Sequence, residues 1–238
     1  MKYTVKPINF KLGEYISLGF EDFKNDIGDY LIAFLLTMIM SIIPFCSLLA
    51  VGNFYKFCRD KRAGKNPETT QIFNFDDFVP YLIFQLILFG IIIILLTPIF
   101  LWALFSGIGA FLGQEAGEGG TAVFVGLSMI TFLLLLLLIF VVLFYLAVKS
   151  FYMIGLISLE GIKDLGTAWK MSKKMTKTNF LNIFLFSIIV GIIAQLGLFL
   201  FGIGIFLTIP ISYIIHYHAF EDGIQQIKED EMVEIGQV

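Results

Sequence analysis

Residues 123–148 read VFVGLSMITFLLLLLLIFVVLFYLAV, and the unbroken leucines Leu133–Leu138 at their centre decide the class of fold. They belong to a run of 30 uncharged residues from Gly119 to Val148. A helix needs roughly 20 apolar residues to cross the ~30 Å hydrocarbon layer of a bilayer. This stretch is therefore predicted to be a membrane-spanning helix, from about Val123 to Val148.

The composition of the whole chain has the same character. Of its 238 residues, 58% are hydrophobic and 15% are charged, whereas about a quarter of the residues in a soluble domain are charged. A water-soluble protein of this size cannot bury so much apolar surface in one core. The composition indicates an integral membrane protein and argues against a disordered, disulfide-stapled or nucleic-acid-binding chain.

Two further uncharged stretches are long enough to span a bilayer. Phe78–Gln114 predicts one helix over about residues 79–104, with Pro98 kinking its far end. Thr178–Phe220 predicts two short spans, over about residues 180–198 and 204–217. Glycines suit tight turns, so the break between the two short spans is expected at Gly202 and Gly204.

The first uncharged stretch, Tyr30–Tyr55, is split near its middle by Pro44. It is either one tilted, kinked helix or a re-entrant hairpin of two half-helices. Broken backbone at membrane depth is tolerated only where protein or a watery cavity satisfies it. The distribution of charge favours the hairpin, because a single crossing would place four lysines outside the cell.

Basic residues indicate which connections face the cytoplasm. The glycine-rich connection Ser106–Thr121 contains none of the 16 lysines and arginines, so we expect it to be an external loop. The other connections and both termini are then cytoplasmic, at a bacterial cytoplasmic (inner) membrane. The expected organisation is a cytoplasmic N-terminal segment with an interfacial helix (1–29), a multi-pass membrane domain (30–220) and an acidic, disordered cytoplasmic tail (221–238).

The segment Ile162–Lys177 is typical of an amphipathic helix at the membrane surface. Ile162, Leu165 and Trp169 recur at helical spacing, and lysines line another face. Such a helix buries its apolar side chains while its lysines contact lipid phosphates. The expected contacts to anionic lipid are Lys163, Lys170, Lys173, Lys174 and Lys177. The alternative is an orientation anchor that has no specific ligand.

Several short motifs resemble those of known membrane proteins. They comprise Gly52, Arg59-Asp-Lys-Arg62, Gly64, Pro67, Phe75-Asp-Asp-Phe78, Ala168-Trp-Lys-Met-Ser172, Gly202-Ile-Gly204, Pro210 and His218-Ala-Phe220. Over roughly residues 30–222 the chain resembles an uncharacterised bacterial and archaeal family of multi-pass membrane proteins of unknown function. That family is related to the membrane domain of some glycerophosphodiester phosphodiesterases. The resemblance implies an all-helical inner-membrane domain of about six helical segments, and it carries over neither catalytic residues nor the phosphodiesterase activity.

The candidates for chemistry are few. The expected spans contain no Asp, Glu, Lys or Arg, which argues against proton pumps and voltage-gated channels. Gln85 and Gln195 are the intramembrane polar residues, predicted to form hydrogen bonds between helices or, as the alternative, to bind a ligand. His218 and Asp222 share a helix face, but two ligands are a weak zinc signal. We therefore predict no catalytic, cofactor-binding or metal-binding residues.

The sequence thus predicts an all-α, polytopic helical membrane bundle of about six helical segments, some of them short or re-entrant, with interfacial amphipathic helices. The predicted function is non-enzymatic: a scaffold or accessory subunit that contacts lipids and associates with itself or another membrane protein. The alternative is a small-solute or lipid transporter that uses the Pro- and Gly-broken helices.

Overall fold

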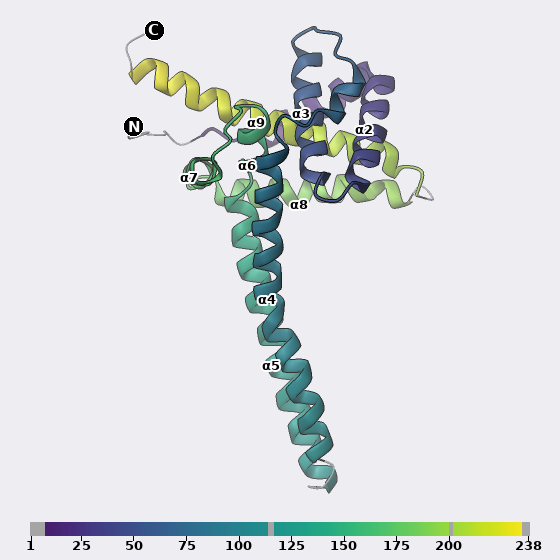
Figure 1. Ribbon diagram of the computed structural model, residues 1–238, viewed down its shortest axis with the longest axis vertical. Helices are drawn as coiled ribbons and strands as arrows, with labels where there is room; N and C mark the ends of the chain where they lie inside the picture. The colour runs from purple at the N-terminus through teal and green to yellow at the C-terminus, as the bar shows by residue number, and fades with distance from the viewer. Residues whose placement is uncertain (1–7, 114–116, 200–201, 235–238) are drawn as a thin grey trace. The chain divides into compact units, whose positions relative to one another are not determined.

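The computed structural model describes residues 8–113, 117–199 and 202–234, and these ranges contain helices and turns but no strand (Figure 1). Three of the helices are long and apolar enough to cross a membrane, over Phe78–Gly109, Val125–Ser158 and Phe180–Phe199. The predicted all-α, polytopic membrane fold is confirmed. The chain divides into two compact units, of which one comprises residues 85–147 and the other the remainder.

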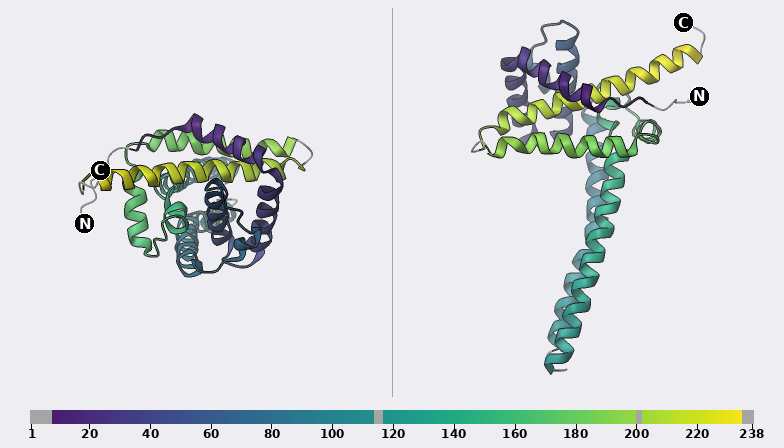
Figure 2. Two further views of the ribbon diagram at one scale, coloured as in Figure 1. Left: turned by 90° about the horizontal axis from the view of Figure 1, so that it is seen from above. Right: turned by 180° about the vertical axis from the view of Figure 1, so that it is seen from behind.

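The unit formed by residues 85–147 contains most of two long helices, α4 (Phe78–Gly113) and α5 (Gly117–Lys149), which run alongside each other (Figures 1 and 2). The indole of Trp102 stacks on Phe132, and its Nε1 donates to the carbonyl of Ser128 at 3.0 Å. The hydroxyls of Ser106 and Ser128 are 2.9 Å apart. These polar contacts join two helices whose side chains are otherwise mostly exposed and apolar.

Two predictions about this region are wrong. The helix does not end near Leu104, because α4 passes through Pro98 and continues to Gly113. The glycine-rich connection is largely helical, since α5 already begins at Gly117; residues 114–116 lie outside the described ranges. Where no water competes for backbone groups, a helix tolerates proline and glycine, because its remaining backbone groups still bond within the helix. The hydroxyl of Thr97 also donates to the carbonyl of Ile93 at 2.8 Å, beside the proline.

The other unit contains the remaining helices, packed around α9 (Ile205–Glu234). In Figure 2, α9 lies alongside α1 (Leu12–Asn25) and α8 (Phe180–Leu196). It also packs against α2 (Ile27–Ile42), α3 (Ser47–Arg62) and α6 (Met153–Ser158). Short 3-10 turns occupy Thr69–Phe73 and Gly197–Phe199, and α7 (Leu165–Met175) contacts α6.

Helices α2 and α3 form the hairpin favoured by the charge distribution. Pro44 lies in the turn between them, and Phe45 adopts a left-handed backbone conformation with φ of 61°. The ring of Tyr30 packs edge-on against Phe57, with ring centroids 5.8 Å apart, and joins the two helices. Helix α2 itself turns by 101° from α1, so α1 and α2 together could also form a bent span.

The C-terminal part of the chain differs from the prediction of a short span and a disordered tail. Helix α9 continues past Tyr217 to Glu234. Ile224 and Ile227, which the prediction places in the tail, are buried. Packing of these apolar side chains in the core supports the helix well beyond the expected end of the span.

Candidate functional site

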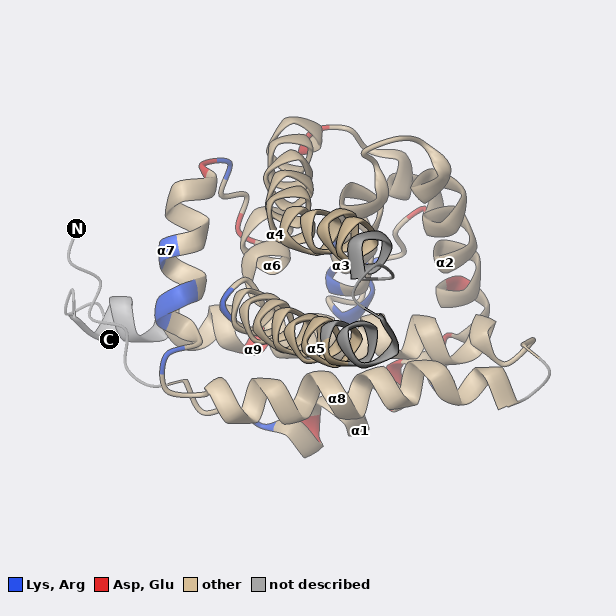
Figure 3. Ribbon diagram, turned by 90° about the horizontal axis from the view of Figure 1, so that it is seen from below, with Lys and Arg blue, Asp and Glu red and all other residues tan. Residues whose placement is uncertain are grey.

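The five predicted lipid-contacting lysines lie on or beside α7, where Figure 3 shows basic residues along the ribbon. All five are exposed. The opposite face of α7 is buried through Ala168, Ser172 and Met175. The Ser172 hydroxyl donates to the carbonyl of Lys149 at 2.7 Å and accepts the backbone N–H of Tyr152 at 3.2 Å. These contacts set the rotation of α7, so that its lysines face away from the core.

Asp164 caps the N-terminus of α7. Its Oδ2 accepts the backbone N–H of Thr167 at 2.7 Å and the hydroxyl of the same residue at 2.5 Å. These hydrogen bonds to the ionised carboxylate lower the pKa of Asp164 below its usual value. The cap fixes where α7 begins, which in turn fixes the positions of the lysines along it.

A second polar site joins α1, α3 and α9, and sequence reasoning did not predict it. Arg59 of α3 donates from Nε and Nη2 to Glu221 Oε2 at 3.0 and 2.8 Å, and also donates to the carbonyl of Leu159. Asp222 accepts the hydroxyl of Tyr15 at 2.6 Å and the ammonium of Lys11 at 3.2 Å. Neighbouring carboxylates of α9 thus bind two different helices.

Asp22 of α1 completes the same network. Its Oδ2 is 2.8 Å from His218 Nε2, and both its oxygens accept from Arg62 Nη1 at 3.2 Å. His218 therefore faces Asp22, whereas the sequence had suggested Asp222 as its neighbour on the helix. Within the described ranges no group of three His, Cys, Asp or Glu side chains could hold a metal ion.

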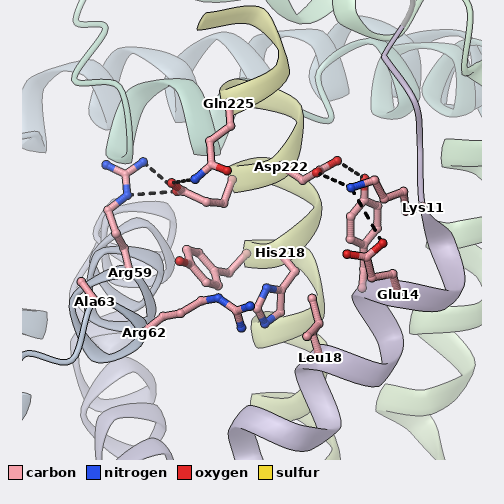
Figure 4. A pocket seen from close by; sticks show the side chains of 12 residues that line it. Lys11, Glu14, Leu18, Arg59, Arg62, Ala63, His218, Asp222 and Gln225 are labelled. Carbon is pink, nitrogen blue, oxygen red and sulfur yellow. Dashed lines mark hydrogen bonds and ion pairs between the residues drawn. The ribbon is translucent and has the colours of Figure 1, made fainter. Parts of the chain in front are cut away.

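These side chains surround a cavity of about 470 Å³ between α1, α3 and α9 (Figure 4). Arg59 and Arg62 line it from α3, Glu14 from α1 and His218 from α9, and Lys11 lines it from the position just before α1. The spacing of Arg59 and Arg62 places both on one face of a helix, so the sequence could have predicted that these two arginines lie together. The sequence could not predict which helices the two arginines face, because that depends on the tertiary structure.

The other predicted residues are dispersed. Pro44, Gly202 and Gly204 lie in turns, and Gly202 has φ of 79°. Gln85 is half-buried on α4, while Gln195 is exposed on α8. None of these residues lines the 470 Å³ cavity.

His216 and the acidic pair before α4 have structural partners. The Nδ1 atom of His216 lies 2.7 Å from the carbonyl of Ser212, and its ring packs among those of Phe186 and Phe220. Asp77 is buried and forms a 2.5 Å ion pair with Lys56. These contacts hold neighbouring elements together.

No protein-family model, curated protein or solved structure matches the chain. The resemblance to the uncharacterised membrane-protein family therefore stays a prediction.

Proposed function

We propose that the protein is a non-enzymatic integral membrane scaffold or accessory subunit. It associates laterally with a second copy of itself or with another membrane protein, and it contacts anionic lipid through the lysines of α7. Both termini and α7 lie on the cytoplasmic side of a bacterial inner membrane.

The observation that carries the proposal is the exposed apolar surface of α4 and α5. The 32-residue segment Phe78–Gly109 is about 48 Å long at 1.5 Å per residue. Even at a tilt of about 40°, the upper end of the usual range, it would project over about 37 Å. The hydrocarbon layer is about 30 Å thick. Tyr81 and Phe84, near the start of the segment, are buried by the chain itself, so the part left for lipid or a partner is the exposed remainder.

The exposed apolar faces of α4 and α5 are available to a lateral protein partner. Only 6% of the most apolar 18-residue window of α4 is buried, and the fraction is the same for the span that contains α5. Small residues favour close helix packing in membranes. Gly90 of α4 and Gly126 of α5 have open space where a side chain would be, which leaves room for a neighbouring helix.

Mild-detergent purification tests the scaffold proposal directly. We expect the protein to run as a stable oligomer, or with a stoichiometric partner detected by mass spectrometry, and to catalyse no solute flux after reconstitution in liposomes. A monomer that transports solute would exclude the scaffold.

The lipid contact is tested by paired substitutions of lysine by glutamine. Replacing Lys170 and Lys173 should reduce the enrichment of anionic over zwitterionic lipid in the copurified fraction, because each lysine near an anionic surface contributes about 1 kcal/mol. The control is the replacement of Lys24 and Lys65, which are exposed on other parts of the chain. Equal enrichment in wild type and both variants would contradict the lipid contact.

Orientation is tested by labelling single cysteines with an impermeant reagent in intact cells. Cysteines introduced at Lys61 and Lys174 should stay unlabelled, and one at Gly117 should react. The native Cys46 and Cys58 are buried, and they are replaced by alanine in the background chain. Labelling at Lys61 or Lys174 would overturn the proposed arrangement.

A small-solute or lipid transporter is the second candidate, favoured by the helix breaks at Pro44 and Gly202. Such breaks expose carbonyls that can coordinate a solute. At the second break, however, Gly197 packs against the backbone of Gly204, since an added Cβ would lie 2.3 Å from the Gly204 carbonyl carbon. This close backbone packing leaves no space for a solute between the two glycines, so we prefer the scaffold.

A further inference from the structure

The cavity between α1, α3 and α9 contains hydrogen-bond donors that the protein itself does not use. Arg62 donates from Nη1 to Asp22, and its side chain is 43% exposed. A guanidinium has five N–H donors. Among the described residues, the Nε and Nη2 groups of Arg62 have no partner.

Tyr217 provides a second unused donor. Its side chain lines the cavity, and its hydroxyl forms no hydrogen bond within the part of the chain that the structure describes. A phenol that lines a polar cavity in this way can donate to an acceptor that enters from solvent. Arg62 and Tyr217 therefore define an end of the cavity suited to an anion.

The α1 wall has the opposite character. The Glu14 carboxylate is 55% exposed, and its nearest basic partner, the ammonium of Lys11, is 3.8 Å away. This contact is long compared with those of Glu221 and Asp222, which are held by short hydrogen bonds. Glu14 is the carboxylate best able to accept a cationic group of a ligand.

The charges that line the cavity balance. Three basic side chains face three acidic ones, namely Lys11, Arg59 and Arg62 against Glu14, Glu221 and Asp222. A purely anionic ligand would approach these carboxylates unfavourably, and a purely cationic one would meet the arginines. A ligand that carries both charges avoids both penalties.

We propose that this cavity binds a zwitterionic phosphate ester, with its phosphate at Arg62 and Tyr217 and its ammonium group at Glu14. A phosphate offers enough acceptor oxygens for the planar guanidinium and the phenol together. The volume of about 470 Å³ lies within the usual range for small-molecule sites. The ligand has the chemistry of phosphoethanolamine, either free or as the head group of a phospholipid, and the inference is independent of the scaffold proposal.

Isothermal titration of the full-length protein in detergent tests the proposal with four probes. Phosphoethanolamine should bind more tightly than glycerol phosphate, which lacks the ammonium group, and than ethanolamine, which lacks the phosphate. It should also bind more tightly than β-alanine, a zwitterion that carries a carboxylate in place of phosphate. Equal binding of phosphoethanolamine and β-alanine, or no heat of binding with any probe, would overturn the proposal.

Substitutions locate the site. Tyr217→Phe removes only a hydroxyl without a protein partner, so the fold should be unchanged while phosphoethanolamine binds about tenfold more weakly, or worse. Tyr213→Phe, one turn earlier on α9 and outside the cavity lining, is the matched control and should bind as the wild type does. Wild-type affinity in Tyr217→Phe would refute the assignment.

Glu14→Gln tests the ammonium end. It should weaken binding of phosphoethanolamine severalfold, whereas glycerol phosphate, which the carboxylate repels, should bind equally or more tightly. The same loss for both probes would contradict the proposed orientation. Nanodiscs then distinguish the two sources of the ligand. If free phosphoethanolamine binds more weakly in nanodiscs with phosphatidylethanolamine than in those with phosphatidylglycerol alone, the head group is the ligand, and equal binding assigns the site to the free ester.

Discussion

Replacing Gly52 by alanine tests how closely α3 packs against the first turn of α4. A Cβ at this position would lie 2.3 Å from Tyr81 Oη and 2.7 Å from Cζ. The Tyr81 ring is fully buried, and its hydroxyl donates to the carbonyl of Ile154 at 3.1 Å. The ring therefore cannot move away without losing its packing and this hydrogen bond.

The expected cost follows from these contacts. Overpacking in a core costs about 1–3 kcal/mol, and the strained hydrogen bond adds about 0.5–1.5 kcal/mol. The gain from replacing glycine by alanine within a helix offsets about 0.5–1 kcal/mol. Gly52→Ala should lower the free energy of unfolding by about 0.5–4 kcal/mol, and each kcal/mol corresponds to a fall in Tm of about 2–4 °C for a chain of this size.

Thermal unfolding in one detergent, followed by intrinsic fluorescence, measures the effect. Gly191→Ala on α8 is the matched control, because a Cβ there meets no atom within 4 Å, and its Tm should be unchanged or higher. In a Tyr81→Ala background, Gly52→Ala should become neutral or stabilising. A Tm for Gly52→Ala equal to that of the control, or an undiminished penalty without the Tyr81 ring, would refute the reasoning.

Three further predictions concern single side chains. Glu221→Gln should cost about 1–3 kcal/mol by weakening the bonds from Arg59, whereas Lys65→Gln, which breaks an exposed ion pair, should cost below about 1 kcal/mol by the same thermal assay. Phe45→Gly should raise the free energy of unfolding by about 1 kcal/mol, because glycine adopts a positive φ without strain; an unchanged Tm would contradict this. Since the pKa of Asp164 is lowered in the folded chain, the stability from its cap is complete above pH ~4 and is lost as the pH falls through the lowered pKa. Hydrogen-exchange protection at the start of α7 should then fall in the wild type but not in Asp164→Asn.

Local sequence patterns predicted those features that depend on the residues of one helix or one turn alone. The lysine row of α7 follows from the spacing of charged and apolar residues, and it is exposed as expected. The turn at Pro44 follows from proline's restricted backbone. Pro98 lies inside α4, as predicted, but the helix continues beyond the expected end near Leu104 to Gly113, because backbone groups in a bilayer have no water to bond with.

The site between α1, α3 and α9 could not be predicted in the same way. Asp22 and His218 are separated by 196 positions, and Arg59 and Glu221 by 162. Each side chain alone is typical of a solvated, charged helix. Their partners depend on which helices are neighbours, and that information is absent from any single stretch of sequence.

The sequence by itself determined that this chain belongs in a membrane. The free energy of transfer from water to the bilayer depends on how many apolar side chains there are and on how many follow one another along the chain. Tertiary structure alone decided that the last helix is part of the core up to Ile227 and that its carboxylates pair with α1 and α3. The physical reason is range: hydrophobic transfer is a property of each segment, whereas an ion pair or hydrogen bond requires two atoms to lie within a few ångströms of each other.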